Sequence, residues 1–238
     1  MDNDRPLKPR IRGASQPRKR APGRPPRQPA EASGAVRAGL LDAAIACFVR
    51  KGIAATTLRE IAREAHVTPA LLNYYFGDKA QLQAALVEER VLPALDALRA
   101  PLAGAGDDVA ALVAGFVAGI GRVAVLHPWL PPLWVREILC EGGALRDVLF
   151  ERLGPEFPLM MARRFADAQA RGEINADLDP RLLMVSLVGL TLFPIAGAPI
   201  WRRLFADDPT TAALDFDTLR RHTLALLDRG IEMKEVSP

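Results

Sequence analysis

The chain has 238 residues, a formal net charge of +3 and a hydrophobic share of 50%. This length is enough for one large or two small domains with a sizeable buried core. Two cysteines are too few for a disulfide framework, and no apolar run follows the charged N-terminus, which argues against a signal peptide and a secreted disulfide-rich protein. Ala and Leu dominate and aromatic residues make up only 6%, which favours helices over sheets. We therefore expect an all-α protein of a reducing, cytoplasmic compartment.

Positive charge is concentrated at the N-terminus. Residues 1–29 hold nine Lys or Arg and two Asp, a charge of +7, so the rest of the chain carries 3 − 7 = −4. The prolines of this segment oppose helix formation, and we expect residues 1–32 to form a disordered basic arm. Such arms follow phosphates or enter a minor groove. The sequence around Arg24 is similar to the Gly-Arg-Pro core of AT-hook peptides, although Ala21 and Pro22 precede the glycine where a basic residue is expected. A solvated tail without sequence preference is the alternative.

Two short helices joined by a tight turn are predicted within residues 57–82. Thr57 is followed by Glu60 three positions later, the pattern of a capping box in which each side chain satisfies a free backbone N–H. Thr68 caps the second helix, and Pro69 occupies the first helical position, where its missing N–H has no consequence. This spacing is typical of a helix–turn–helix, whose second helix fits the major groove of B-DNA.

The second helix, residues 69–76, has one face for the core and one for solvent. Leu72 and Phe76 lie four apart and are expected to face the core. Asn73 and Tyr74 then point outward, and both side-chain types can hydrogen-bond to base edges or phosphates. The alternative is a core helix with half-buried tyrosines.

The stretch from Val36 to about Leu86 resembles the TetR family of transcriptional repressors. The matching blocks are an amphipathic helix, VRAGLLDAAIACFVRKG, followed by TTLREIA, AHVT, LNYYF and DKAQL in the same order and spacing. The family usually has Tyr where this chain has Asn73. The resemblance implies an all-α fold with an N-terminal three-helix helix–turn–helix DNA-binding domain, residues 33–82, and a larger helical effector-binding and dimerisation domain, residues 83–238.

The resemblance also implies which side chains meet DNA. Carried over position by position, four residues contact phosphates: Thr57, Arg59, Tyr75 and Lys79. Five face the groove: Thr68, Pro69, Ala70, Asn73 and Tyr74. Arg24 of the basic arm is a further candidate. The expected partner is a near-palindromic double-stranded operator, bound by a homodimer and released by a small-molecule effector.

Helical patterns continue to the C-terminus. We predict helices over residues 81–99 (kinked at Pro93), 108–126, 129–139, 144–153, 155–171, 180–193 and 211–231. In the family the last two helices form a four-helix bundle with those of the partner. We therefore expect a C2 homodimer through the helices near 180–197 and 211–231.

Residues 182–201 contain no charged residue and are long enough to cross a bilayer. Pro194 and Pro199 lie within them, and ordinary charged residues flank them. A helix that is apolar all round can also be buried in a core or a subunit interface. We expect no membrane insertion.

Family members usually hold their effector between helices of the second domain. Eight candidate lining residues follow from the sequence: His127, Trp129, Trp134, Arg136, Cys140, Met161, Phe165 and Phe193. Apolar walls with a few polar groups would suit an aromatic or amphipathic ligand. For each of these residues core packing is the alternative, and Arg136 with Glu137 could equally form a surface pair.

No catalytic or metal-binding motif is found. The three histidines, His66, His127 and His222, are far apart, and no P-loop or dinucleotide fingerprint is present. We expect no enzyme activity, no metal and no cofactor. The second alternative to an operator-specific regulator is an architectural DNA binder that acts through its basic arm.

Overall fold

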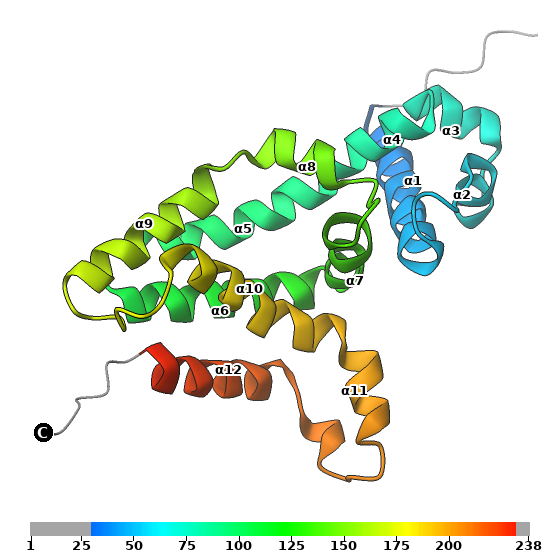
Figure 1. The fold of residues 1–238 in the computed structure, drawn as a ribbon. Helices are drawn as coiled ribbons and strands as arrows, with labels where there is room; N and C mark the ends of the chain where they lie inside the picture. Colours follow the sequence, from blue (N-terminus) through cyan, green and yellow to red (C-terminus); the bar gives the residue numbers. More distant parts are fainter. Residues whose placement is uncertain (1–29, 232–238) are drawn as a thin grey trace, which may run out of the picture.

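The computed structural model describes residues 30–231, and this part of the chain is built of helices without a strand (Figure 1). The predicted all-α fold is confirmed. Most of the predicted basic arm, residues 1–29 with Arg24, lies outside the described residues.

Three helices form one end of the molecule: α1 (Ala30–Lys51), α2 (Leu58–Glu64) and α3 (Pro69–Phe76). A long helical rod leads away from this end and consists of α4 (Lys79–Leu86), the π-helical segment η1 (Val87–Val91) and α5 (Leu92–Ala103). The remaining elements are α6 (Val109–Leu126), α7 (Leu130–Trp134), the π-helical segment η2 (Val135–Leu139), α8 (Arg146–Leu153), α9 (Glu156–Ala170), α10 (Pro180–Ala196), α11 (Ala198–Leu204), the 3-10 turn η3 (Thr211–Ala213) and α12 (Phe216–Ile231).

The predicted kink at Pro93 takes the form of a change in helix type. Pro93 lies in the first turn of α5, directly after the π-helical segment η1. A proline nitrogen cannot donate to the carbonyl four residues earlier, and a π-helical segment changes the hydrogen-bond register at that point. The rod therefore continues through the proline.

The sequence predicted that this helix ends at residue 193, before Pro194. Instead, α10 runs to Ala196 with the proline inside it. Because Pro194 has no N–H, the carbonyl of Leu190 loses its usual donor within the helix. The hydroxyl of Thr223 on α12 donates to that carbonyl instead, at 3.4 Å. A contact between two helices thus replaces a bond that the sequence of α10 alone would leave unmade.

The C-terminal helix is shorter than predicted. α12 begins at Phe216 and not at Thr211, because Asp215 forms its cap and accepts a hydrogen bond from the backbone N–H of Thr218 at 2.9 Å. α12 lies on α6 at Gly121, where an added Cβ would come within 1.4 Å of Phe216 Cζ. The close approach of these two helices therefore requires glycine.

Two clusters of buried side chains hold the fold together. The first joins α1–α4 to η1, α7, η2 and α8 and includes Phe48, Leu72 and Ile138. The second joins α6, α9, α10 and α12 and includes Phe165 and Leu187. The helix–turn–helix end therefore shares its core with part of the following helices.

α6 is the one helix among residues 30–231 that is long and apolar enough to cross a membrane unaided. Its apolar side chains, such as Phe116 and Val117, form the second buried cluster. The uncharged stretch 182–201 falls into α10 and α11, which bend by 65° at their junction. α6 therefore has a packing role within the helical fold, and the uncharged stretch does not form one straight helix.

Candidate DNA-binding surface and effector cavity

Local hydrogen bonds at both helix starts form the turn between α2 and α3. Thr57 Oγ accepts from the backbone N–H of Glu60 at 3.3 Å, and Glu60 Oε2 accepts from the N–H of Thr57 at 2.9 Å. His66 takes the left-handed conformation, with φ of 55°, in the turn itself. Thr68 Oγ then accepts from the N–H of Leu71 at 3.3 Å, which starts α3. Both predicted caps are confirmed.

The capping box also determines the charge at the start of α2. An ion pair with Lys51 and the hydrogen bond from Thr57 lower the pKa of Glu60 to about 2. The Thr57 hydroxyl lies 3.1 Å from Glu60 Oε2, so both of its hydrogen-bonding functions are used inside the protein. A phosphate contact by this hydroxyl stays a prediction and would require the capping box to rearrange.

α3 presents its polar face to solvent. Leu72 and Phe76 are buried against α1, α2 and α4, as predicted from their spacing. Tyr74 is 82% exposed and Asn73 is exposed beside it. The other three groove candidates, Thr68, Pro69 and Ala70, are exposed as well. The structure thus brings the five predicted groove-facing residues together on one accessible surface.

Tyr75 differs from its neighbour because its ring packs against the first core. Its hydroxyl lies 3.2 Å from Ser33 Oγ on α1. Lys79 is half-buried, and its ammonium group donates to the carbonyl of Ala54 at 3.3 Å. Both residues border the exposed face of α3, and their phosphate contacts stay predictions.

Arg37 of α1 fixes the C-terminal end of α3. Its guanidinium lies 4.4 Å from the centre of the Phe76 ring and donates to the carbonyl of Tyr75 at 3.2 Å. The same guanidinium forms an ion pair with Glu89 in η1. α3 is therefore connected to η1 in the long rod by a single side chain.

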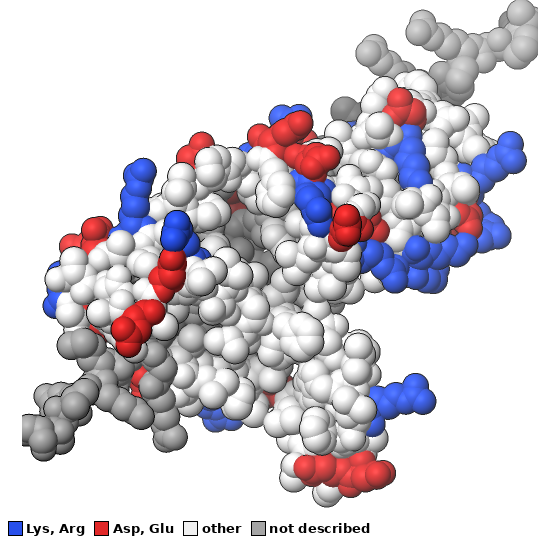
Figure 2. Space-filling view, in the orientation of Figure 1, with Lys and Arg blue, Asp and Glu red and all other residues white. Residues whose placement is uncertain are grey.

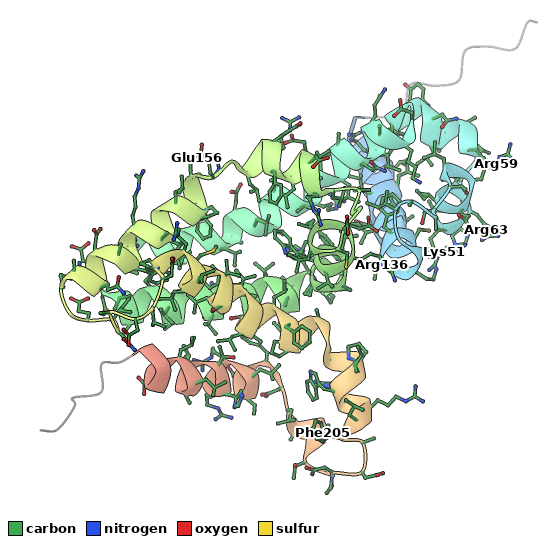
Figure 3. All side chains as sticks on the ribbon, viewed as in Figure 1. Lys51, Arg59, Arg63, Arg136, Glu156 and Phe205 are labelled. Carbon is green, nitrogen blue, oxygen red and sulfur yellow. The ribbon has the colours of Figure 1, made fainter. Side chains whose placement is uncertain are left out.

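Basic side chains gather on the surface beside α2 (Figure 2). Arg59 and Arg63, four residues apart, are both exposed and have no ion-pair partner within residues 30–231. Figure 3 shows both side chains directed away from the domain. By contrast, Arg50 and Lys51 at the end of α1 pair with Glu64 and Glu60. The sequence predicted only Arg59; its spacing of one helical turn from Arg63 was the available signal for the second residue.

The main cavity has a volume of about 220 Å³ and lies where the two buried clusters meet. Leu95 and Leu98 of α5 form one wall, and Met184 of α10 forms another. Of the eight predicted lining residues only Trp134 borders it. Figure 2 shows this face of the molecule hollowed between α8, α9 and α10.

Four of the other candidates lie around α7 and η2. The rings of His127 and Trp129 meet edge to face, 5.7 Å apart, at the turn before α7. Arg136 donates to the carbonyl of Val49 on α1 at 3.0 Å. Cys140 is a free, exposed thiol after η2. These residues surround the junction with the helix–turn–helix end and are absent from the cavity wall.

The last three candidates have other positions. Met161 and Phe165 are fully buried in the second core, which matches the packing alternative for residues at helical spacing. Phe193 is 74% exposed on α10. Phe116 and Phe157, which the sequence reasoning did not select, lie in the cavity wall with ring centres 6.4 Å apart.

Glu137 connects the cavity side of the molecule to α1. It is only 5% exposed, so it does not form a surface pair with Arg136. Its Oε1 accepts from the N–H of Ile53, just after α1, at 2.9 Å, and its Oε2 accepts from the N–H of Ala144 at 3.2 Å. The bond to Ile53 joins η2 to the helix–turn–helix end. Glu137 lies three residues after Trp134 of the cavity wall.

Among residues 30–231, no group of His, Cys, Asp and Glu side chains is arranged to hold a metal ion. The accessible helix α3, the exposed arginines of α2 and the separate apolar cavity together define a helix–turn–helix DNA-binding protein with a helical second part. Residues 40–86 match the profile of the bacterial regulatory proteins of the tetR family.

The chain is 38% identical over 197 residues to the HTH-type transcriptional repressor SCO4008 of Streptomyces coelicolor, a match that covers 82% of this chain and 96% of that protein. The chain belongs to the TetR family of transcriptional regulators. Its relatives are therefore transcription regulators rather than enzymes.

Solved structures show the same fold. The ketosteroid transcriptional regulator KstR2 of Mycobacterium tuberculosis matches with a TM-score of 0.63 and 20% identity, over 83% of this chain and 95% of that one. A SmeT–triclosan complex matches with a TM-score of 0.56 and 22% identity, over 86% of this chain and 95% of that one.

Proposed function

We propose that the protein is a cytoplasmic repressor that binds a near-palindromic operator as a homodimer and leaves it when a small molecule enters the cavity. The observation that carries this proposal is the exposed face of α3 with Asn73 and Tyr74, which we call the reading surface. Tyr74 and Asn73 are free to reach base edges, while buried Leu72 and Phe76 hold the helix in place.

The domain arrangement follows from the same surface. Residues 33–82 serve as the DNA-binding domain and residues 83–238 as the effector-binding and dimerisation domain. Residues 1–32 serve as a basic arm beside the DNA. Arg59 and Arg63 supply phosphate contacts on the α2 side, because exposed guanidinium groups without protein partners keep their charge available.

Dimerisation through α10 and α12 is supported by exposed apolar side chains. On α10, Leu182 and Val185 are 63% and 62% exposed, and Leu226 on α12 is 50% exposed. Ile200 and Leu204 of α11 extend this apolar surface. An apolar patch of this kind marks a protein–protein interface, and a C2 dimer would bury it against its own copy.

Two connections lead from the cavity to the reading helix. The α5 wall continues through η1, where Glu89 pairs with Arg37 beneath α3. Trp134 continues into η2, where Glu137 accepts from Ile53. We propose that the effector favours the state in which these connections separate the two reading helices, a coupling typically of about 1–3 kcal/mol. The SmeT–triclosan complex supports a small-molecule site in this fold.

The reading surface is tested with a pair of substitutions at one position. Tyr74→Ala removes the whole side chain, whereas Tyr74→Phe removes only the hydroxyl. We expect Tyr74→Ala to weaken operator binding by about 1–3 kcal/mol per lost base contact, with unchanged helicity and dimerisation because the ring is exposed. Equal operator affinity of wild type and Tyr74→Ala in equilibrium titrations would remove Tyr74 from the reading surface.

The phosphate contacts have a different signature. Arg59→Ala and Arg63→Ala should each weaken binding to all DNA sequences alike and reduce the slope of log affinity against log salt by about one. Arg171→Ala, at the far end of α9, is the matched control because that arginine pairs with Glu173. If the control changed the slope as much as the α2 variants, the phosphate assignment would be wrong.

The dimer is tested by sedimentation. Val185→Glu places a charge in the proposed α10 interface and should shift the protein from dimer to monomer at micromolar concentration, while helicity is retained because the position is exposed. A wild-type protein that sediments as a 25.8 kDa monomer would contradict the dimer.

A further inference from the structure

The cavity wall carries no ionisable side chain. Its lining residues are aliphatic, aromatic, proline or glycine, and almost all of its surface is apolar. The walls are helices, whose backbone N–H and C=O groups are mostly bonded to each other. Trp134 is the one lining residue with a polar side-chain atom, and its Nε1 is buried without a hydrogen-bond partner in the described part of the chain. This indole N–H is therefore the one side-chain hydrogen-bond donor that belongs to a wall residue.

Charged residues lie close to this wall in sequence but turn away from it. Asp96 on α5, Arg122 on α6 and Arg152 on α8 are exposed and are absent from the lining. Arg152 pairs with Glu88 of the rod. Glu156, at the start of α9, is directed outward in Figure 3. No charged side chain is thus part of the cavity lining.

An ionised ligand would lose its hydration in this cavity and gain no counter-charge, and the single indole N–H of Trp134 cannot replace the several hydrogen bonds that water makes to an ion. An uncharged ligand gains from apolar burial without that loss. The wall is also partly aromatic: Phe116, Phe157 and Trp134 form part of it, and aromatic pairs prefer offset or edge-to-face contacts with another ring. The volume, about 220 Å³, is below the roughly 300–1,000 Å³ of drug-sized pockets.

We propose that the cavity takes a compact, uncharged aromatic or hydrocarbon molecule and rejects the same skeleton when it carries a carboxylate or an ammonium group. The cavity should reject ions because its wall has no side chain of opposite charge to pair with them. This inference rests on the proposed effector function and narrows it, because an amphipathic ion, one of the ligand types that the sequence allowed, is excluded.

Three probes with one naphthalene skeleton test the selection: methyl 2-naphthoate, 2-naphthoate and protonated 2-(aminomethyl)naphthalene. Binding to the full-length protein is measured by calorimetry at pH 7.5 without DNA. We expect the ester to bind at least tenfold more tightly than either ion, which corresponds to about 1.4 kcal/mol or more. The proposal is overturned if either ion binds within tenfold of the ester, or if none of the three binds.

Two variants locate the binding. Ala124→Phe fills the cavity from α6 and should reduce ester binding at least tenfold, whereas Ala110→Phe, on an exposed position of the same helix, should leave it unchanged. Met184→Glu adds an acid to the wall from a half-buried position and should raise affinity for the ammonium probe at least tenfold. Ester binding that Ala124→Phe leaves intact, or an ammonium affinity that Met184→Glu leaves unchanged, would place the ligand elsewhere.

Operator release is measured separately, by titrating the ester into the protein–operator complex. Ester binding without release would keep the ligand class and overturn the repressor mechanism. Release of operator by an ion that binds as tightly as the ester would keep the mechanism and overturn the ligand class.

Discussion

Removing the carboxylate of Glu137 should destabilise the protein strongly, because this one side chain accepts two backbone hydrogen bonds. In Glu137→Ala the N–H groups of Ile53 and Ala144 lose their acceptors at a site where the glutamate is only 5% exposed. The buried N–H of Ile53, left unsatisfied, costs about 1–3 kcal/mol, and the part-buried N–H of Ala144 adds a smaller loss. That is a large part of the about 5–15 kcal/mol that stabilises a typical protein.

The surroundings prevent an easy repair. An added Cβ at Gly143 would lie 2.3 Å from the Glu137 carbonyl oxygen, so the backbone is already tightly packed there. Glu137→Gln keeps one acceptor oxygen and exchanges the other for an amide donor. It should therefore lose one of the two bonds and about 1–3 kcal/mol.

Urea unfolding followed by circular dichroism gives the free energy of unfolding of each variant. Amide hydrogen exchange shows which backbone N–H groups lose protection. We expect the N–H groups of Ile53 and Ala144 to exchange faster in Glu137→Ala. Glu141→Ala, an exposed glutamate in the loop after η2, is the control and should change stability by no more than about 0.5 kcal/mol. The reasoning fails if Glu137→Ala is no less stable than Glu141→Ala, or if exchange at Ile53 is unaltered.

Three further outcomes follow from local geometry. Gly121→Ala should lose about 1–3 kcal/mol in urea unfolding, because its Cβ would overlap Phe216, and adding Phe216→Ala should recover part of the loss; additive effects would contradict the contact. The pKa of Glu60 is lowered from 4.5 to about 2, so its ionised carboxylate stabilises the fold at pH values above 4.5, and this contribution is lost as the pH falls towards 2. Glu60→Gln should flatten the profile of stability against pH over that range, and an equally steep profile would refute the assignment. Burial raises the pKa of the Cys47 thiol, so iodoacetamide should modify exposed Cys140 first in mass spectra of the native protein, and equal rates would count against the packing of α1.

Features set by neighbouring residues were predictable from the sequence. The caps at Thr57 and Thr68 depend on a side chain and a backbone group three positions apart, and both are present in the structure. The burial of the Leu72 and Phe76 side chains follows from helical spacing alone. For the same reason the helix–turn–helix is the most securely predicted part of the chain.

The cavity was not predictable in this way. Phe165 fills the second core and Phe157 lines the cavity, although both are phenylalanines of α9 at helical spacing. Which one borders empty space depends on how α9 meets α6 and α10. The buried position of Glu137 is equally non-local, since its acceptor role requires a donor 84 residues away in the chain. Sequence patterns carry no signal for such contacts.

The most direct test of the account is selection of binding sites from random double-stranded DNA by the purified full-length protein. An operator-reading dimer with α3 in the major groove should enrich one sequence with two-fold symmetry, its half-sites about one helical turn or 34–36 Å apart. The variant Asn73→Ala/Tyr74→Ala should fail to enrich that sequence while it still sediments as a dimer. No enriched motif with the wild type, or the same motif with the double variant, would contradict the proposal that this face of α3 reads DNA.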